Sequence, residues 1–278
     1  MVAPLRFFAR RRFLLILLLV VVCAIAWTIH HLYNISLHFT PVTTGLMLIS
    51  TCLVLAFFNA RKKLPFIPLF RASTWLQFHL YAGWFAVFIF LLHINGRWPD
   101  GIFETTLATM FTLVALSGVV GIIITRMIPG RLALHGENVM FERIPALRLK
   151  LQKDVEALVW KSVEETKSFT ISEFYTARLK AYFGRPRNTV RHLFASKVPL
   201  QKLTSEVKLL ERYMVANERA ILADISECIT AKDNLDAQTA GQGLLKYWLF
   251  VHIPLTFSLL ILGLLHGLLA FSFAGGVR

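Results

Sequence analysis

The sequence has few cysteines, and none of them stands in a paired motif. Three occur among 278 residues, at Cys23, Cys52 and Cys228. The absence of CxxC and CxxCH disfavours a zinc knuckle, a thioredoxin-type site and a covalently attached c-type haem. A glycine-rich phosphate loop and the GxGxxG fingerprint of dinucleotide-binding folds are also missing. We therefore do not expect an enzyme that uses a nucleotide or nicotinamide cofactor.

Charged residues are scarce as well, at 17% of the chain, whereas 56% of the residues are hydrophobic. Soluble domains usually have about 25% charged and 45–50% apolar residues. The apolar residues are gathered in five runs, each close to the length of about 20 residues that a membrane-spanning helix needs. The runs cover residues 13–32, 43–60, 74–95, 105–127 and 247–271. The composition therefore predicts an all-α integral membrane bundle of about five spans.

The basic residues predict how the spans are oriented. Four arginines precede the first run and four basic residues occupy 61–71, whereas the loop between the third and fourth runs holds only Arg97. Because basic loops stay on the cytoplasmic side, we expect a cytoplasmic N-terminus and an external C-terminus, in a bacterial inner membrane. The first run resembles a signal peptide but is longer than usual, so we expect an uncleaved anchor. Contact with anionic lipid accounts for the net charge of +14 better than nucleic acid does.

Four regions follow from this pattern. We expect a two-span region at 1–71, spans three and four at 72–130, a cytoplasmic helical insert at 131–245 and span five at 246–278. The insert holds 18 Lys+Arg and 14 Asp+Glu, and amphipathic patterns predict several helices within it. Gly241 and Gly243 precede the last run, and we expect them to form the turn into it.

Two of the apolar runs carry a pair of histidines at the same spacing. His79 and His93 lie on the third run, and His252 and His266 lie on the fifth, each pair 14 residues apart. In an α-helix 14 residues leave two side chains about 40° apart around the axis and about 21 Å apart along it. Each helix therefore offers two imidazoles on one face, one near each side of the bilayer.

These two spans are also expected to run in the same direction. His79 would then face His252, and His93 would face His266, which gives two stacked bis-imidazole sites suited to haem iron. The alternative is that the histidines are polar links between helices. The five runs contain no Asp or Glu, which argues against a proton or metal transporter.

The paired His-x13-His motifs, with a glycine-bearing span between them, resemble the di-haem membrane cytochromes b. That group includes the cytochrome b of quinol-oxidising complexes and the transmembrane domains of ferric-reductase-like proteins. The resemblance covers mainly 72–127 and 247–271. It implies two b-type haems, with His79, His93, His252 and His266 as the axial iron ligands, and it leaves open a quinone as a further cofactor.

Other residues are candidates for contacts with the haems. By their depth Arg71, Arg126 and Lys246 suit the propionates of the inner haem, and Arg97 suits those of the outer one; a role in topology is the alternative. Small residues let a flat macrocycle approach a helix backbone, and plain helix packing explains them equally well. The glycines in question are Gly83, Gly118 and Gly121.

The function expected from the sequence is transmembrane electron transfer by a di-haem subunit of an oxidoreductase complex in a respiratory chain. Its partner would be a quinone or a redox protein on each side. One alternative is a self-contained transmembrane reductase that acts on a metal ion, oxygen or quinone at a haem edge. A second alternative, of another class, is a non-haem membrane scaffold or transporter. Three further histidines near the outer end of the first run, His30, His31 and His38, are expected to be exposed at the interface.

Overall fold

The computed structural model describes residues 3–35, 40–58, 72–132 and 139–274. Within these ranges every regular element is a helix, and no strand is present. The chain divides into two compact units. The first consists of Met1–Val120 with Phe250–Arg278, and the second of Gly121–Leu249. Two long helices, α4 (Ile102–Leu132) and α10 (Ala216–Ala274), contribute to both units.

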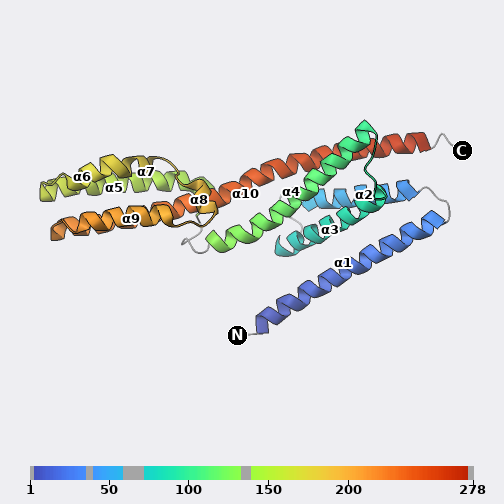
Figure 1. The fold of residues 1–278 in the computed structure, drawn as a ribbon, viewed down its shortest axis with the longest axis horizontal. Coiled ribbons are helices and arrows are strands. Elements are labelled where there is room, and N and C mark those ends of the chain that lie inside the picture. Colours follow the sequence, from blue (N-terminus) through green and yellow to red (C-terminus); the bar gives the residue numbers. More distant parts are fainter. Residues whose placement is uncertain (1–2, 36–39, 59–71, 133–138, 275–278) are drawn as a thin grey trace, which may run out of the picture. The chain divides into compact units, whose positions relative to one another are not determined.

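The first unit contains the apolar helices (Figure 1). They are α1 (Ala3–Ile35), α2 (Thr40–Ala56), α3 (Ala72–His93) and parts of α4 and α10. A helix satisfies its own backbone hydrogen bonds, which is what an apolar segment needs where water is absent. Threonine hydroxyls can also be satisfied within their own helix. The Thr51 hydroxyl, for example, donates to the Met47 carbonyl oxygen at 2.7 Å.

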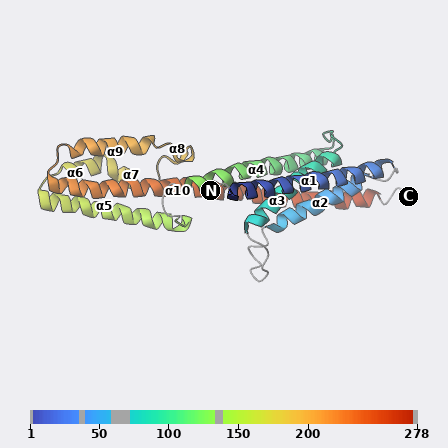
Figure 2. The same ribbon diagram turned by 90° about the horizontal axis from the view of Figure 1, so that it is seen from below.

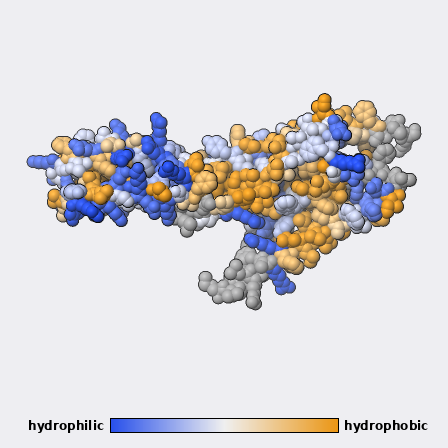
Figure 3. All heavy atoms as spheres, in the orientation of Figure 1, coloured by the Kyte–Doolittle hydropathy of each residue, from blue (hydrophilic) through white to orange (hydrophobic). Residues whose placement is uncertain are grey.

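Four helices of the described chain are long and apolar enough to cross a membrane. They lie at Arg12–Ile35, Ser73–His93, Ile102–Gly130 and Ala216–Phe273, and α2 is apolar but shorter. Large apolar side chains such as Leu18, Ile123 and Phe273 are exposed on these helices. Orange is widespread over the first unit in Figure 3. These features are consistent with an integral membrane protein.

The core of the first unit joins α3, α4 and α10. Ala86 and Phe90 of α3 pack with Ala108 and Phe111 of α4 and with Leu259 of α10. The Phe90 and Phe111 rings are stacked, with centroids 4.2 Å apart. Helix α2 packs most closely against α3. This core lies between the two histidine positions of α3 and holds α10 beside it.

The second unit is built around the N-terminal part of α10, which runs between α5 and α9 (Figure 2). Its other helices are η2 (Phe141–Arg143), α5 (Ile144–Thr166), α6 (Thr170–Phe174), η3 (Tyr175–Leu179), α7 (Lys180–Gly184), α8 (Thr189–Leu193) and α9 (Val198–Glu211). The core includes Val155, Leu179, Phe183, Leu222 and Ile225, all nearly inaccessible to solvent. The expected amphipathic helices of this region therefore meet around a common apolar core.

The expectation of a turn at Gly241 and Gly243 is wrong. Both glycines lie inside α10, which continues without interruption from Ala216 to Ala274. A Cβ atom on Gly241 would come within 3.1 Å of Ile128 Cγ2, so its small size allows close packing of α4 on α10. A glycine inside a helix costs about 1 kcal/mol relative to alanine, and tertiary packing outweighs this local preference.

Candidate functional site

The four histidines singled out by their spacing all belong to the first unit. His79 and His93 project from α3, and His252 and His266 project from α10; all four are half-buried. His93 and His266 are in ring contact, and His79 lies within electrostatic range of His252, so that in each case one histidine comes from each helix. Because 14 residues separate the histidines on each helix, the pairs lie about 21 Å apart along the helix axes.

His93 and His266 face each other directly. Their ring centroids are 6.3 Å apart and the ring planes are inclined at 86°. Imidazole nitrogens lie about 2 Å from a bound transition metal, so two imidazoles on opposite sides of one ion have centroids roughly 6 Å apart. Planes crossed at a right angle are compatible with two ligands on a common axis. The separation of this pair therefore fits axial ligation of a single iron.

Three residues from two other helices surround the His93–His266 pair. The Thr44 hydroxyl of α2 lies 3.1 Å from His93 Nδ1, and Thr44 is almost fully buried at 2% exposure. A Cβ on the neighbouring Gly45 would come within 3.2 Å of His93 Cε1. From the start of α4, the Phe103 ring lies 6.0 Å from the His266 ring. The ring of His93 is thus fixed in place by α2.

His79 and His252 form the second pair, and they are close enough to interact electrostatically. The Phe58 ring lies 4.9 Å from the His79 ring. The Ser117 hydroxyl of α4 lies 3.1 Å from His252 Nδ1. His79 Nδ1 is buried and has no hydrogen-bond partner. The Leu55 backbone on α2 also lies within interaction range of this imidazole.

One histidine in each pair has its Nδ1 next to a hydroxyl. The Thr44 hydroxyl contacts His93, and the Ser117 hydroxyl contacts His252. Such a contact fixes the ring orientation and directs Nε2 away from the hydroxyl, which is how partners beyond the metal orient a ligating imidazole. Within the described residues no three His, Cys, Asp or Glu side chains gather at one point.

The three candidate glycines have different surroundings. No atom of another residue lies within 4 Å of the position that a Cβ would occupy on Gly83 or Gly118. Close packing of a neighbouring helix therefore does not require glycine at either position. A Cβ on Gly121, in contrast, would overlap the Trp248 indole. Gly121 thus serves helix packing within the second unit.

Three of the four candidate basic residues lie in the part of the chain that the structure describes, and none of these three contacts a paired histidine there. Arg71 lies outside the described residues. Arg97 is exposed in the turn after α3, and Arg126 is exposed on α4. Lys246 has a carboxylate partner, Glu142, at 2.7 Å. Arg126 and Lys246 belong to the second unit, and the contacts of all four with haem propionates remain predictions.

Sequence reasoning missed five residues that contact the paired histidines. They are Thr44, Gly45, Phe58, Phe103 and Ser117. A hydroxyl residue inside an apolar run was the only available signal, because Ser and Thr often form hydrogen bonds between membrane helices. That signal did not distinguish Thr44 and Ser117 from threonines such as Thr51, whose hydroxyl bonds within its own helix.

The other histidines lie elsewhere. The His31 ring is exposed and stacks on Trp27 at 5.3 Å, and the neighbouring His30 is half-buried. His38 and His135 lie outside the described residues. His192 is buried in the second unit, with its Nε2 3.5 Å from Asp233 Oδ1.

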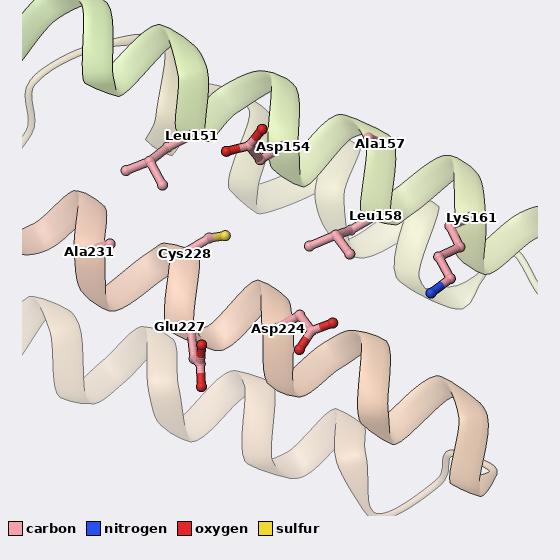
Figure 4. Close-up of a pocket in the computed structure, with 9 residues that line it drawn as sticks. All are labelled: Leu151, Asp154, Ala157, Leu158, Lys161, Asp224, Glu227, Cys228 and Ala231. Atoms are coloured by element: carbon pink, nitrogen blue, oxygen red, sulfur yellow. The ribbon is translucent and has the colours of Figure 1, made fainter.

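A groove of about 560 Å³ runs between α5 and α10 in the second unit. Leu158 and Cys228 point into it from the two helices, and the carboxylates of Asp154 and Asp224 lie along it (Figure 4). None of the residues predicted to bind a cofactor lines it. This groove is therefore not the site that the histidine spacing indicates.

Comparison with protein-family models, curated proteins and solved structures found no match to this chain. A functional assignment therefore depends on the geometry of the histidine pairs.

Proposed function

We propose that this protein is a di-haem b-type cytochrome that transfers electrons across a membrane as a subunit of an oxidoreductase complex. The proposal includes five spans, of which α2 is the short one, in a bacterial inner membrane with a cytoplasmic N-terminus. Redox partners, a quinone or a protein, would meet the chain at the two membrane faces. The single observation that carries the proposal is the 6.3 Å separation of the His93 and His266 rings.

The roles of the chain's own residues follow from their contacts. His93 and His266 would hold one iron, and His79 and His252 would hold the other. Thr44 and Ser117 would orient the imidazoles through Nδ1. A b-type haem supplies a reversible one-electron couple at its iron. The Phe58 and Phe103 rings beside the histidines would help to exclude water, and burial is one of the factors that set a haem potential.

The alternative of a non-haem scaffold assigns the histidines to hydrogen bonding between helices. The Thr44–His93 and Ser117–His252 contacts agree with that role. It gives His266 no hydrogen-bonding role, because the contact seen for His266 with the other histidine is between rings, at 6.3 Å from His93. Ligation of an iron by each pair accounts for all four histidines together.

Haem content per chain tests the proposal. Purified protein analysed as the pyridine haemochrome should contain b-type haem at about two per chain, one for each bis-histidine pair. His93→Ala and His266→Ala should each lose one haem, and it should be the same one in both variants, as judged by the reduced-minus-oxidised spectrum. His31→Ala changes an exposed histidine and should keep both.

Two outcomes would contradict the proposal. A colourless wild-type preparation would exclude haem binding. Full haem content in His93→Ala, His266→Ala, His79→Ala and His252→Ala would assign the ligands elsewhere. A third outcome would change the function but keep the histidine ligands. If the isolated protein reduces an acceptor with an artificial donor and no partner subunit, it is a self-contained reductase and not a subunit of a complex.

A further inference from the structure

A small cavity of about 80 Å³ lies within the second unit, between the end of α4, helix α8 and the middle of α10. Its wall is almost entirely aliphatic, and His192 is its one polar side chain among the described lining residues. The aliphatic residues include Ile124, Met127 and Ile128 of α4, Leu193 of α8, and Ala237 and Leu244 of α10. A site for one water needs only about 10–15 Å³ by the same measure. The cavity therefore has room for part of an organic ligand.

His192 is an unusual residue to find in such a wall. Its side chain is 5% exposed, and its Nε2 lies 3.5 Å from Oδ1 of Asp233, whose side chain is also buried. That distance is too long for a hydrogen bond, and His192 Nε2 has no hydrogen-bond partner. Since buried polar groups are normally hydrogen-bonded, the imidazole is suited to a polar atom that enters the cavity.

Acidic side chains of α10 adjoin the residues that line the cavity. Asp233 faces His192. The next acid on α10, Asp236, pairs with Lys232 and accepts a hydrogen bond from the Arg187 backbone N–H at 3.1 Å. Burial of an unpaired charge in an aliphatic cavity is costly. The surroundings therefore favour an uncharged ligand over an anion such as a fatty acid carboxylate.

The α4 wall of the cavity is part of an apolar helix. Ile124, Met127 and Ile128 all lie within the candidate membrane span Ile102–Gly130. A ligand held against this segment must itself be lipophilic, because the wall offers almost no polar contact. Its polar part must be small, because His192 is the one polar side chain among the lining residues that the structure describes.

We propose that this cavity binds the oxygen-bearing end of an uncharged lipophile, with His192 hydrogen-bonded to a carbonyl or hydroxyl oxygen. An acylglycerol and an alkylated quinone both carry this chemistry. The site belongs to the second unit, whereas the histidine pairs belong to the first, and it does not depend on haem.

Direct binding to the full-length protein in lipid nanodiscs tests the proposal. The radiolabelled probes are a diacylglycerol, a benzoquinone with a short alkyl tail, and palmitate as the anionic comparison. We expect saturable binding of the diacylglycerol or of the benzoquinone, and the probe that binds identifies the source. If neither uncharged probe binds, or if palmitate binds as tightly as the better of them, the proposal is wrong.

Two variants with a matched control locate the site. Ala237→Leu fills the cavity, and His192→Gln keeps a polar group but moves it; each should weaken binding by about tenfold or more. Ala231→Leu makes the same substitution on the same helix but faces the α5 groove, and it should bind within about twofold of wild type. Unfolding curves establish that each variant is folded. Should Ala237→Leu not fold, His192→Gln alone decides, and unchanged binding in a folded variant rejects the site.

Haem content measured on the same samples keeps this test separate from that of the proposed function. His192→Gln should retain the haem of the wild type. A haem-free preparation that binds the lipophile contradicts only the electron-transfer proposal. A haem-containing preparation that binds neither uncharged probe contradicts only the lipophile site.

Discussion

His93 of α3 and His266 of α10 face each other with ring centroids 6.3 Å apart and ring planes at 86°. Each ring has a further neighbour from a different helix, Thr44 of α2 for His93 and Phe103 of α4 for His266. Four helices of the first unit therefore meet at this pair. Changes on α2 or α4 are expected to alter the properties of a cofactor held by α3 and α10.

Replacement of Thr44 by valine should change one haem and leave the other unaffected. Valine keeps the volume of threonine but removes the hydroxyl that lies 3.1 Å from His93 Nδ1. Loss of such an outer partner typically lowers metal affinity or activity by about 10–100-fold. We expect weaker retention of one haem during purification and a shifted midpoint potential, measured by haem assay and by redox titration.

Thr51→Val is the matched control, because it removes a hydroxyl from the same helix. The Thr51 hydroxyl donates to Met47 within α2 and has no role at His93. The control should keep both haems and both potentials. Equal shifts in Thr44→Val and Thr51→Val would show that the effect arises from α2 as a whole.

The double variant Thr44→Val/Ser117→Ala tests whether the two levels are independent. Ser117 contacts His252 Nδ1, so Ser117→Ala should affect the haem that Thr44→Val leaves alone. The two pairs lie about 21 Å apart along the helices, and changes at that distance are usually additive within about 0.3–0.5 kcal/mol. Redox titration of the double variant should therefore show both single shifts. If both histidine pairs affected one and the same haem, the shift in the double variant would differ from the sum of the two single shifts.

Gly45→Ala should disturb the His93–His266 pair through contact alone. An added Cβ would lie 3.2 Å from His93 Cε1, which requires the ring or α2 to move by a few tenths of an ångström. We expect lower occupancy of one haem by spectroscopy, with little loss of helix content by circular dichroism. Gly130→Ala is the control, since nothing lies within 4 Å of its Cβ position. Full haem content in Gly45→Ala would mean that His93 adjusts freely.

The sequence predicted the helices well where one run of apolar residues makes one helix. The third run, 74–95, corresponds to α3, and the fourth, 105–127, lies within α4. The same pattern does not fix the number of spans, because α2 ends at Ala56 and is shorter than the four candidate spans. The turn predicted at Gly241 and Gly243 was wrong because packing of Ile128 against Gly241 favours a continuous α10.

The site was predictable only as far as it depends on one helix at a time. The spacing of His79 and His93 fixes their common face, because helix geometry is the same in every α-helix. Thr44 and Ser117 reach His93 and His252 only through the way α2 and α4 pack on their neighbours. Such contacts depend on how each helix is rotated about its own axis. A run of apolar residues does not predict this rotation, because it looks alike on all sides of the helix.

The last prediction concerns pH and the second unit. The Tyr175 hydroxyl donates to Glu156 Oε1 at 2.8 Å. This hydrogen bond holds the pKa of Glu156 below its ordinary value, and burial raises the pKa of Tyr175. The Glu156 contribution to stability is present above the unfolded pKa of about 4.3 and is lost as the pH falls through the lower folded pKa. The Tyr175 contribution is present below the unfolded pKa of about 10 and is lost as the pH rises towards the higher folded value.

Tyr175→Phe should therefore destabilise the second unit at neutral pH by about 1 kcal/mol, the usual net value of one hydrogen bond. It should also flatten the loss of stability below about pH 4.3, because the pKa of Glu156 loses the hydrogen bond that lowers it most, and above about pH 10, because phenylalanine does not titrate. Hydrogen exchange of α5 amides in the full-length protein, measured across this pH range, reports both effects. Tyr213→Phe, at a residue that is 88% exposed, should follow the wild-type profile. If Tyr175→Phe follows it as well, the Tyr175–Glu156 hydrogen bond contributes nothing to the stability of the unit.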